Sequence, residues 1–245
     1  MFNRGILLAV DEKLEWLLPW WWNKYSAHNT LPVAFIDFGL SHYGRSYCRE
    51  RGEIIDFRED LFLGSSTSHA KKGEILFGKN LWTNRKSWVK KPLAFLATPF
   101  ERTLWIDIDC EVLTSLDSLF EREGEIYLAK ETEPSIARDR MLKNIADDEI
   151  LYSSGVVLYH KDSPLIEKWA KAVMQQGDHF WSDQHALSRV IHRGQYPIHL
   201  LEPEYNWRMS QGFNIHASII LLGGELGQRL HPPLWRHRRR TGRPT

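Results

Sequence analysis

The sequence predicts a single α/β domain with a mixed, mostly parallel central sheet and helices on both faces. Short apolar runs, several of which end in an acidic residue, alternate with amphipathic segments, and this alternation is typical of parallel sheets. The 245 residues are enough for one sizeable core, and the 42% hydrophobic and 26% charged content is that of a globular chain. We expect the domain to span residues 1–228 and a basic, disordered tail to span residues 229–245.

Apolar runs of strand length occur at seven places in the chain. They lie at residues 5–10, 31–36, 103–106, 126–129, 151–159, 198–201 and 214–222. Gly155 interrupts the fifth run, and a glycine inside a strand pattern often marks the close approach of a ligand or of another backbone. Two polar stretches, residues 58–78 and 131–149, are expected to form an exposed loop and a helix with a loop.

Segments with helical character fill most of the spaces between these runs. They lie at residues 14–25, 43–51, 81–89, 92–97, 113–120, 165–174 and 181–191. Ser41 is placed to cap the second of these helices, and Pro92 is placed to start the fourth, because proline fits the first turn of a helix. Asp183 and Gln184 fall in the first turn of the last one.

Two carboxylates stand at the end of the central predicted strand. Asp107 and Asp109 follow the run Thr103-Leu-Trp-Ile106, which is typical of a strand buried on both faces. Residues i and i+2 of a strand point to the same face, and ligands of open α/β sheets bind outside the carboxyl ends of the strands. Adjacent carboxylates repel each other unless a cation lies between them, and oxygen ligands suit Mg²⁺ or Mn²⁺. The pair therefore predicts a metal site, against the plainer alternative that one Asp caps a turn and the other is solvated.

Lys91 stands directly before the short helix that we expect to begin at Pro92. A helix N-terminus favours anions, and the lysine adds a full positive charge, so the two together could hold a diphosphate. The alternative is that Lys91, like most lysines, is solvated on the surface. Asp183 has a plain alternative too, because an acidic residue in the first turn stabilises a helix through its dipole.

Composition and targeting signals bear on where the chain works. The net charge is +1, but five arginines among the last ten residues leave −4 for the rest. The two cysteines, Cys48 and Cys110, lack metal-ligand spacing and fit a reducing compartment. The first apolar run is too short for a signal peptide or a membrane span. We expect a cytoplasmic protein without a nucleic-acid partner, and the basic tail leaves open a peripheral contact with the inner face of a membrane.

These motifs occur in an order that resembles glycosyltransferases of the GT-A fold, the nucleotide-diphospho-sugar transferase superfamily, and above all its family 8-like branch. The resemblance covers residues 5–228. The family's Asp-x-Asp motif matches Asp107-Ile-Asp109, and the block Trp88–Trp105 resembles the family's lead-in. The resemblance implies an enzyme that uses Mn²⁺ or Mg²⁺ to move a sugar from a nucleotide-diphosphate sugar to an acceptor such as a glycan or a lipid-linked saccharide.

The resemblance also implies roles for residues outside the metal motif. Asp183 and Gln184 match the Asp-Gln pair that faces the transferred sugar, and both are candidate catalytic residues. Asp183 is the candidate general base if the enzyme inverts configuration, whereas retention, which family 8 implies, needs no clear base. The substrate-binding residues that we expect are Ala9, Asp11, Asp37, Lys91, Asp107, Ser154, Gly155, Asn206 and Trp207.

One departure from the family pattern concerns the metal. Family members commonly end the domain with His-x-x-Gly and a nearby Lys, where the His is a metal ligand and the Lys contacts the diphosphate. Here Leu221 and Gln228 stand at those two positions, and they bring neither a ligand nor a charge. Either two carboxylates, phosphate and water hold the metal, or the chain is a catalytically impaired protein that binds a nucleotide sugar or glycan.

A second enzyme class also carries Asp-x-Asp after an apolar strand. Haloacid dehalogenase-type phosphatases use the first Asp as a nucleophile, and they normally have Thr or Val two residues after the second Asp, where this chain has Glu111. Their motif usually lies near the start of the domain, whereas Asp107 follows several predicted strands and helices. A phosphatase is therefore the weaker alternative. The sequence leaves the donor, the acceptor, the stereochemical course and the oligomeric state open.

Overall fold

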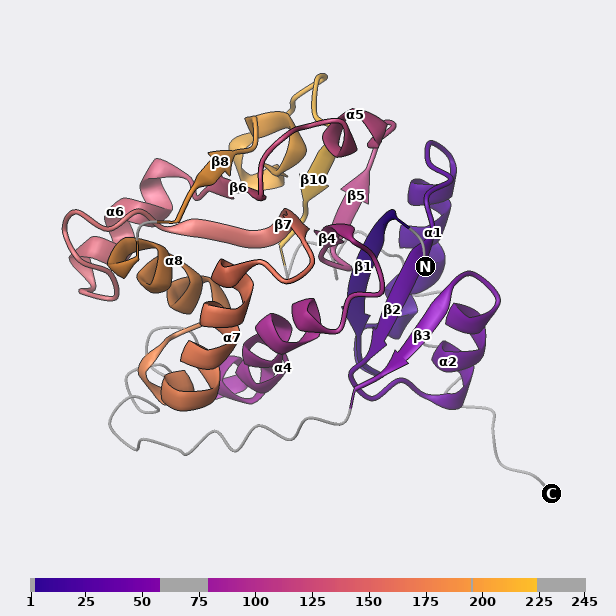
Figure 1. The fold of residues 1–245 in the computed structure, drawn as a ribbon, viewed down its shortest axis with the longest axis horizontal. Coiled ribbons are helices and arrows are strands. Elements are labelled where there is room, and N and C mark those ends of the chain that lie inside the picture. The colour runs from indigo at the N-terminus through magenta and orange to yellow at the C-terminus, as the bar shows by residue number, and fades with distance from the viewer. Residues whose placement is uncertain (1–2, 58–78, 195, 224–245) are drawn as a thin grey trace.

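The computed structural model describes residues 3–57, 79–194 and 196–223. The strands are β1 (Arg4–Val10), β2 (Val33–Asp37), β3 (Glu53–Asp56), β4 (Arg102–Ile106), β5 (Cys110–Val112), β6 (Ile126–Lys130), β7 (Tyr152–His160), β8 (Ile198–Leu200), β9 (Trp207–Arg208) and β10 (Ile219–Leu221). The α-helices are α1 (Leu18–Ser26), α2 (His42–Arg49), α4 (Lys79–Leu96), α5 (Asp117–Phe120), α6 (Glu133–Met141), α7 (Pro164–Gln176) and α8 (Asp183–Arg193). Figure 1 shows how these elements are arranged.

A seven-stranded sheet forms the centre of the molecule, in the order β3-β2-β1-β4-β7-β6-β8. All neighbouring pairs are parallel except the two that β7 makes, which are antiparallel. The predicted mixed, mostly parallel sheet is confirmed. Because β7 runs the other way, its first residues lie beside the carboxyl end of β4, where the backbone N–H of Asp107 donates to the carbonyl of Gly155 at 2.9 Å.

Helices cover both faces of this sheet, as predicted (Figure 1). One core joins the sheet to α4, α7 and α8, and the other joins it to α1, α2, α5 and a small second sheet of β5, β10 and β9. Strand β1 shows the alternation that a doubly covered sheet requires, because Ile6 and Leu8 pack in one core and Leu7 packs in the other.

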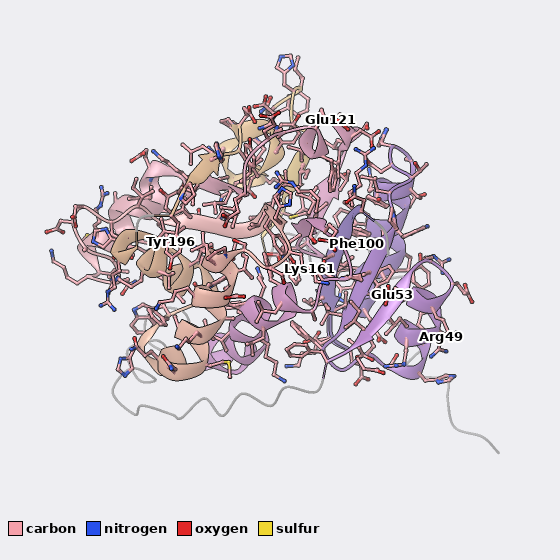
Figure 2. The ribbon with its side chains drawn as sticks, in the orientation of Figure 1. Arg49, Glu53, Phe100, Glu121, Lys161 and Tyr196 are labelled. Carbon is pink, nitrogen blue, oxygen red and sulfur yellow. The ribbon has the colours of Figure 1, made fainter. Side chains whose placement is uncertain are left out.

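Close packing beside β1 depends on a glycine. A Cβ atom added to Gly5 would lie 2.5 Å from the ring of Phe100, which the loop before β4 carries and which is 1% exposed. Figure 2 labels Phe100 near the centre of the molecule. Any larger residue at position 5 would push this ring away from the strand, so the pair fixes how the segment before β4 meets the sheet.

One helix prediction is wrong. The two helices expected at residues 81–89 and 92–97 are a single helix, α4, with Pro92 inside it. Proline removes one backbone donor and normally breaks a helix. Apolar residues on both sides of it, for example Val89 and Phe95, are fully buried in the core with the sheet, and this tertiary packing holds the helix together across the proline.

Three short strands were not predicted. β3 lies at an edge of the main sheet, and β5 and β9 belong to the small sheet. Runs of two to four residues carry too little periodicity to be seen in a sequence. The expected loop at residues 58–78, the closing loop beyond Gly223 and the basic tail lie outside the described residues. Among the described residues, no helix is both long enough and apolar enough to cross a membrane.

Candidate functional site

A pocket of about 540 Å³ lies at the carboxyl ends of β1 and β4. The start of β7, the first turn of α8, the helix α4 and the small sheet complete its wall. The lining residues are Ala9, Asp11, Lys13, Leu14, Leu17, Phe38, Trp88, Lys91, Trp105, Asp107, Ile108, Asp109, Arg138, Ser153, Ser154, Gly155, Trp181, Ser182, Asp183, Gln184, His185, Arg208, Leu221 and Gly223. The pocket lies where open α/β sheets place their ligands.

Asp107 lies in the wall of this pocket at the end of β4. One of its carboxylate oxygens accepts a hydrogen bond from the indole N–H of Trp105 at 2.7 Å, and the ammonium of Lys91 lies 2.9 Å away. The side chain keeps 24% of its surface exposed. Asp107 is therefore oriented by two donors while part of its carboxylate faces the pocket.

Lys91 connects Asp107 to α8. Its ammonium lies 3.3 Å from the carboxylate of Asp183 and 3.2 Å from the hydroxyl of Ser154, and that hydroxyl donates to Asp183 at 2.6 Å. Burial of Lys91 disfavours its charged form, but the two carboxylates outweigh that effect and raise the pKa of Lys91 above its ordinary value. The lysine is thus a fixed positive charge inside the pocket and not a solvated surface residue.

Asp109 is the second carboxylate of the motif. Burial and repulsion by Asp107 raise its pKa to about 6. Strand β10 lies beside it, because Leu221 pairs with Cys110 and the N–H of Leu222 donates to the carbonyl of Asp109 at 3.1 Å. The position where the resemblance implied a histidine ligand is therefore adjacent to the motif, and it carries an aliphatic side chain.

The donor set suits a hard divalent cation that shares its coordination with a substrate. Asp107 and Asp109 both line the pocket, and burial together with repulsion by Asp107 raises the pKa of Asp109. Within the described ranges, no group of three or more His, Cys, Asp and Glu side chains is arranged to hold a metal ion. Mg²⁺ and Mn²⁺ need only one or two carboxylates when phosphate and water supply the remaining ligands, so the residues present fit such an ion.

Most of the residues singled out in the sequence meet in this one pocket. Its lining contains nine of them: Ala9, Asp11, Lys91, Asp107, Asp109, Ser154, Gly155, Asp183 and Gln184. The expected close approach at Gly155 is modest, because a Cβ there would lie 3.4 Å from Asp107, which is ordinary contact. Asp11 also organises the turn after β1, since its carboxylate accepts from the backbone N–H groups of Lys13 and Leu14 at 3.0 and 3.1 Å.

Three of the predicted substrate-binding residues lie outside the lining. The carboxylate of Asp37 accepts from the backbone N–H groups of Gly39 and Leu40 and pairs with Arg45. Asn206 is 7% exposed, and the indole N–H of Trp207 donates to the carbonyl of Gly212 at 2.9 Å. The contacts of Asp37 and Trp207 hold turns together.

Arg208 lines the pocket and was missed by the sequence reasoning. It directly follows Asn206 and Trp207, two of the expected substrate-binding residues, and it pairs with the buried Glu131, whose side chain is 2% exposed. In the small sheet, Leu221 pairs with Arg208 on one side and with Cys110 on the other, so an arginine lies one strand beyond the aliphatic position. Ser182, His185 and Arg138 were missed as well. Nothing in their local sequence distinguishes them from surface residues.

Known proteins resemble this chain in structure but do not match it in sequence. The sequence matches no protein-family model, and no curated protein matches it. The structure superposes on the galactosyltransferase LgtC, solved in complex with donor and acceptor sugar analogues, with a TM-score of 0.60 and 15% identity over 90% of this chain and 87% of LgtC.

The chain has the GT-A fold. Two further structures agree with this assignment. Mouse xyloside xylosyltransferase 1 matches with a TM-score of 0.56 and 14% identity over 92% of this chain and 98% of its own. The glycosyltransferase GlyE of Streptococcus pneumoniae matches with a TM-score of 0.56 and 18% identity, and the chain spans 55% of its length. The resemblance to GT-A glycosyltransferases that the sequence indicated is confirmed at the level of the fold.

Proposed function

We propose that the chain is a metal-dependent glycosyltransferase that moves a sugar from a nucleotide-diphosphate sugar to a saccharide or lipid-linked acceptor. The observation that carries this proposal is the position of Asp107 and Asp109, which lie at the end of β4 in a pocket that also contains Lys91 and Asp183. The likeness to LgtC, which was solved with donor and acceptor sugar analogues, supports a site for both substrates in one pocket.

The leaving diphosphate is assigned to the Asp107–Asp109 end of the pocket. A Mn²⁺ or Mg²⁺ ion held by Asp107 and Asp109 would supply Lewis-acid stabilisation of the negative charge that develops on the diphosphate. Lys91 supplies a fixed positive charge at the same place, because its ammonium is already held by Asp107 at 2.9 Å and is largely shielded from solvent. Arg208 adds a second positive charge from β9.

The nucleoside and the sugar are assigned to opposite walls. Ala9 and Asp11 at the end of β1 form the wall for the base and ribose, where the Asp11 carboxylate would accept from hydroxyl groups. Ser154, Gly155, Asp183 and Gln184 form the wall for the transferred sugar. Asp183 is already bound to the Ser154 hydroxyl at 2.6 Å and lies 3.3 Å from Lys91, so its role is to orient sugar hydroxyls from a fixed position.

A catalytically impaired binding protein is the second candidate. Leu221 favours it, because this aliphatic side chain lies beside the motif where a third metal ligand would strengthen binding. The phosphatase alternative has less support. Its nucleophile would be Asp107, and this carboxylate already accepts from Trp105 and pairs with Lys91.

A thermal-shift panel of nucleoside diphosphates and nucleotide sugars, with Mn²⁺ and with chelator, tests the proposal, and each stabilising compound is then assayed for release of nucleoside diphosphate. A ligand that binds only the folded chain raises its melting temperature by mass action. A metal-dependent shift with diphosphate release would support the transferase, and a shift without release would support the binding protein. The absence of any shift, together with hydrolysis of p-nitrophenyl phosphate, would refute both in favour of the phosphatase.

A further inference from the structure

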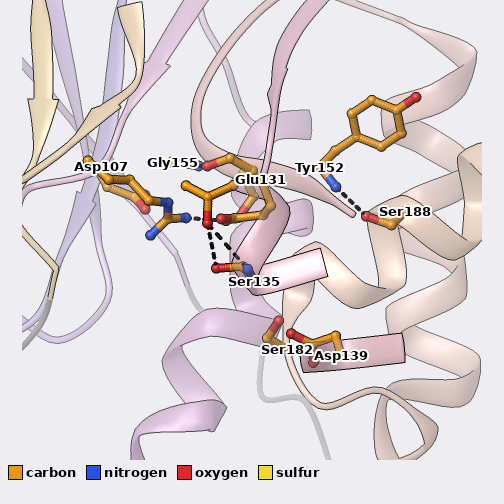
Figure 3. A network of polar contacts seen from close by, with 12 residues as sticks. Asp107, Glu131, Ser135, Asp139, Tyr152, Gly155, Ser182 and Ser188 are labelled. Atoms are coloured by element: carbon orange, nitrogen blue, oxygen red, sulfur yellow. Dashed lines mark hydrogen bonds and ion pairs between the residues drawn. The ribbon is translucent and has the colours of Figure 1, made fainter. Parts of the chain in front are cut away.

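Three side chains at one wall of the pocket form a hydroxyl–imidazole–carboxylate chain. The hydroxyl oxygen of Ser182 lies 2.8 Å from Nδ1 of His185, and Nε2 of His185 lies 3.1 Å from Oδ1 of Asp139 on α6. Ser182 and His185 line the pocket, whereas Asp139 is fully buried. Figure 3 labels Ser182 and Asp139, the two ends of this chain of contacts. The chain of contacts therefore leads from a buried carboxylate to a hydroxyl at the pocket surface.

The surroundings of Asp139 decide which imidazole nitrogen carries the proton. Burial disfavours the Asp139 anion, but hydrogen bonds from His185, Asn144 and Arg138 outweigh that effect and lower the pKa of Asp139 well below its ordinary value. An ionised carboxylate can only accept hydrogen bonds, so Nε2 of His185 is the N–H donor. Nδ1 is then left with a lone pair, which accepts the hydroxyl proton of Ser182.

A simple helix-capping role does not account for this arrangement. Ser182 is the residue that precedes α8, and a serine there ordinarily accepts a hydrogen bond from a backbone N–H of the first turn. The side chain of Ser182 makes no such capping bond. Its hydroxyl lies within hydrogen-bond distance of the His185 ring in place of the helix backbone, so the ring is the group to which this hydroxyl can pass its proton.

The residue that the sequence suggested as a base already has two partners. The Asp183 carboxylate accepts from Ser154 at 2.6 Å and lies 3.3 Å from the ammonium of Lys91. Nδ1 of His185 faces the Ser182 hydroxyl, and a positive charge on the ring would lie 3.1 Å from the buried Asp139 carboxylate.

We propose that the Ser182–His185–Asp139 chain is the proton acceptor for the acceptor hydroxyl, a role that rests on the proposed transferase function. The acceptor oxygen forms a bond to the anomeric carbon, and the bond from that carbon to the diphosphate breaks with both electrons leaving on the diphosphate. The acceptor proton passes to the Ser182 oxygen as the Ser182 proton passes to Nδ1 of His185. Asp139 holds the imidazolium through Nε2. The acceptor proton leaves in either stereochemical course.

These roles make Ser182 a catalytic residue and make His185 and Asp139 positioning residues that act through it. The test uses the full chain with Mn²⁺ and a panel of UDP-galactose, UDP-glucose, UDP-N-acetylglucosamine and GDP-mannose, with water as the acceptor. Release of nucleoside diphosphate is measured for the wild type and for His185→Gln and Asp139→Asn. We expect kcat to fall by about 100-fold or more in both variants, with KM for the donor unchanged within about twofold.

Two controls separate proton transfer from a structural role. His192→Gln makes the same substitution on the same helix outside the pocket lining and should keep the wild-type kcat. His185→Ala should regain activity when imidazole is added, which a loss of helix position alone would not allow. If the wild type turns over and kcat is unchanged in His185→Gln and Asp139→Asn, the relay is refuted but the proposed transferase function is not. Wild-type chain that releases no nucleoside diphosphate from any donor would overturn the relay and the transferase together.

Discussion

Leu221 of β10 pairs with Cys110 of β5, the residue that directly follows Asp109. The strand pairing brings position 221 to the edge of the metal motif, and the side chain there lines the pocket. The small sheet therefore places residue 221 where a third metal ligand could stand, but the leucine side chain at this position cannot bind a metal. We expect this position to decide how strongly the proposed site binds a metal.

Leu221→His should strengthen metal binding. An imidazole at this position adds a nitrogen ligand to the two carboxylates, and we expect the affinity for Mn²⁺ to rise by roughly tenfold or more, which is about 1.4 kcal/mol. Titration calorimetry of the metal alone measures the effect. Ile220→His is the matched control, because the neighbouring residue of a strand points to the opposite face. An equal affinity in Leu221→His and the wild type would show that position 221 does not face the metal.

Arg208→Gln should destabilise the fold through Glu131. The Glu131 side chain is 2% exposed, so loss of its arginine leaves a buried charge without its partner. We expect the free energy of unfolding to fall by about 3 kcal/mol, as measured by urea denaturation. The double variant Arg208→Gln with Glu131→Gln should recover most of this loss, because the unpaired charge is gone. Additive losses in the double variant would contradict the pairing.

Metal affinity should depend on pH through Asp109. Its pKa is raised to about 6, so the folded chain keeps this proton from about pH 4 to about pH 6. Mn²⁺ must displace it, and the affinity should rise roughly tenfold per pH unit below pH 6 and level off above it. Without metal, stability should fall between about pH 4 and about pH 6, because the unfolded chain releases the proton first. Equal Mn²⁺ affinity at about pH 5 and about pH 7.5 would refute this assignment.

The part of the site that lies at strand ends was readable from the sequence. Asp11 and Asp107 each end an apolar run, and local pattern is enough to recognise a strand and its last residue. Asp183 and Gln184 were placed correctly in the first turn of α8, because the helix start is also a local signal. Parallel strand topology then brings these separate ends to one edge of the sheet.

The contribution of the small sheet was not readable. β9 has two residues, and Arg208 acquires its place in the pocket from pairing with β10 and from Glu131, which lies 77 residues earlier in the chain. The same holds for His185, because its hydrogen bond with Asp139 of another helix cannot be inferred from the local sequence. From the sequence alone, a basic residue in a short segment is predicted to be solvated, and only tertiary contacts show which partner it has. Asp37 shows the reverse case, in which a local signal misleads. It ends a strand, but its carboxylate pairs with Arg45 and accepts two backbone hydrogen bonds, and it does not line the pocket.

The most direct test of the central claim is calorimetric titration of the nucleoside diphosphate that the panel identifies, against the wild type and against Asp109→Asn. Asp148→Asn on the surface, with a side chain 82% exposed, is the control. We expect wild type and control to bind in Mn²⁺ and to lose affinity by about 100-fold or more in chelator, equivalent to about 2.7 kcal/mol. Asp109→Asn should bind weakly under both conditions. Equal affinity of all three proteins, with and without Mn²⁺, would contradict a metal-dependent donor site at Asp107 and Asp109.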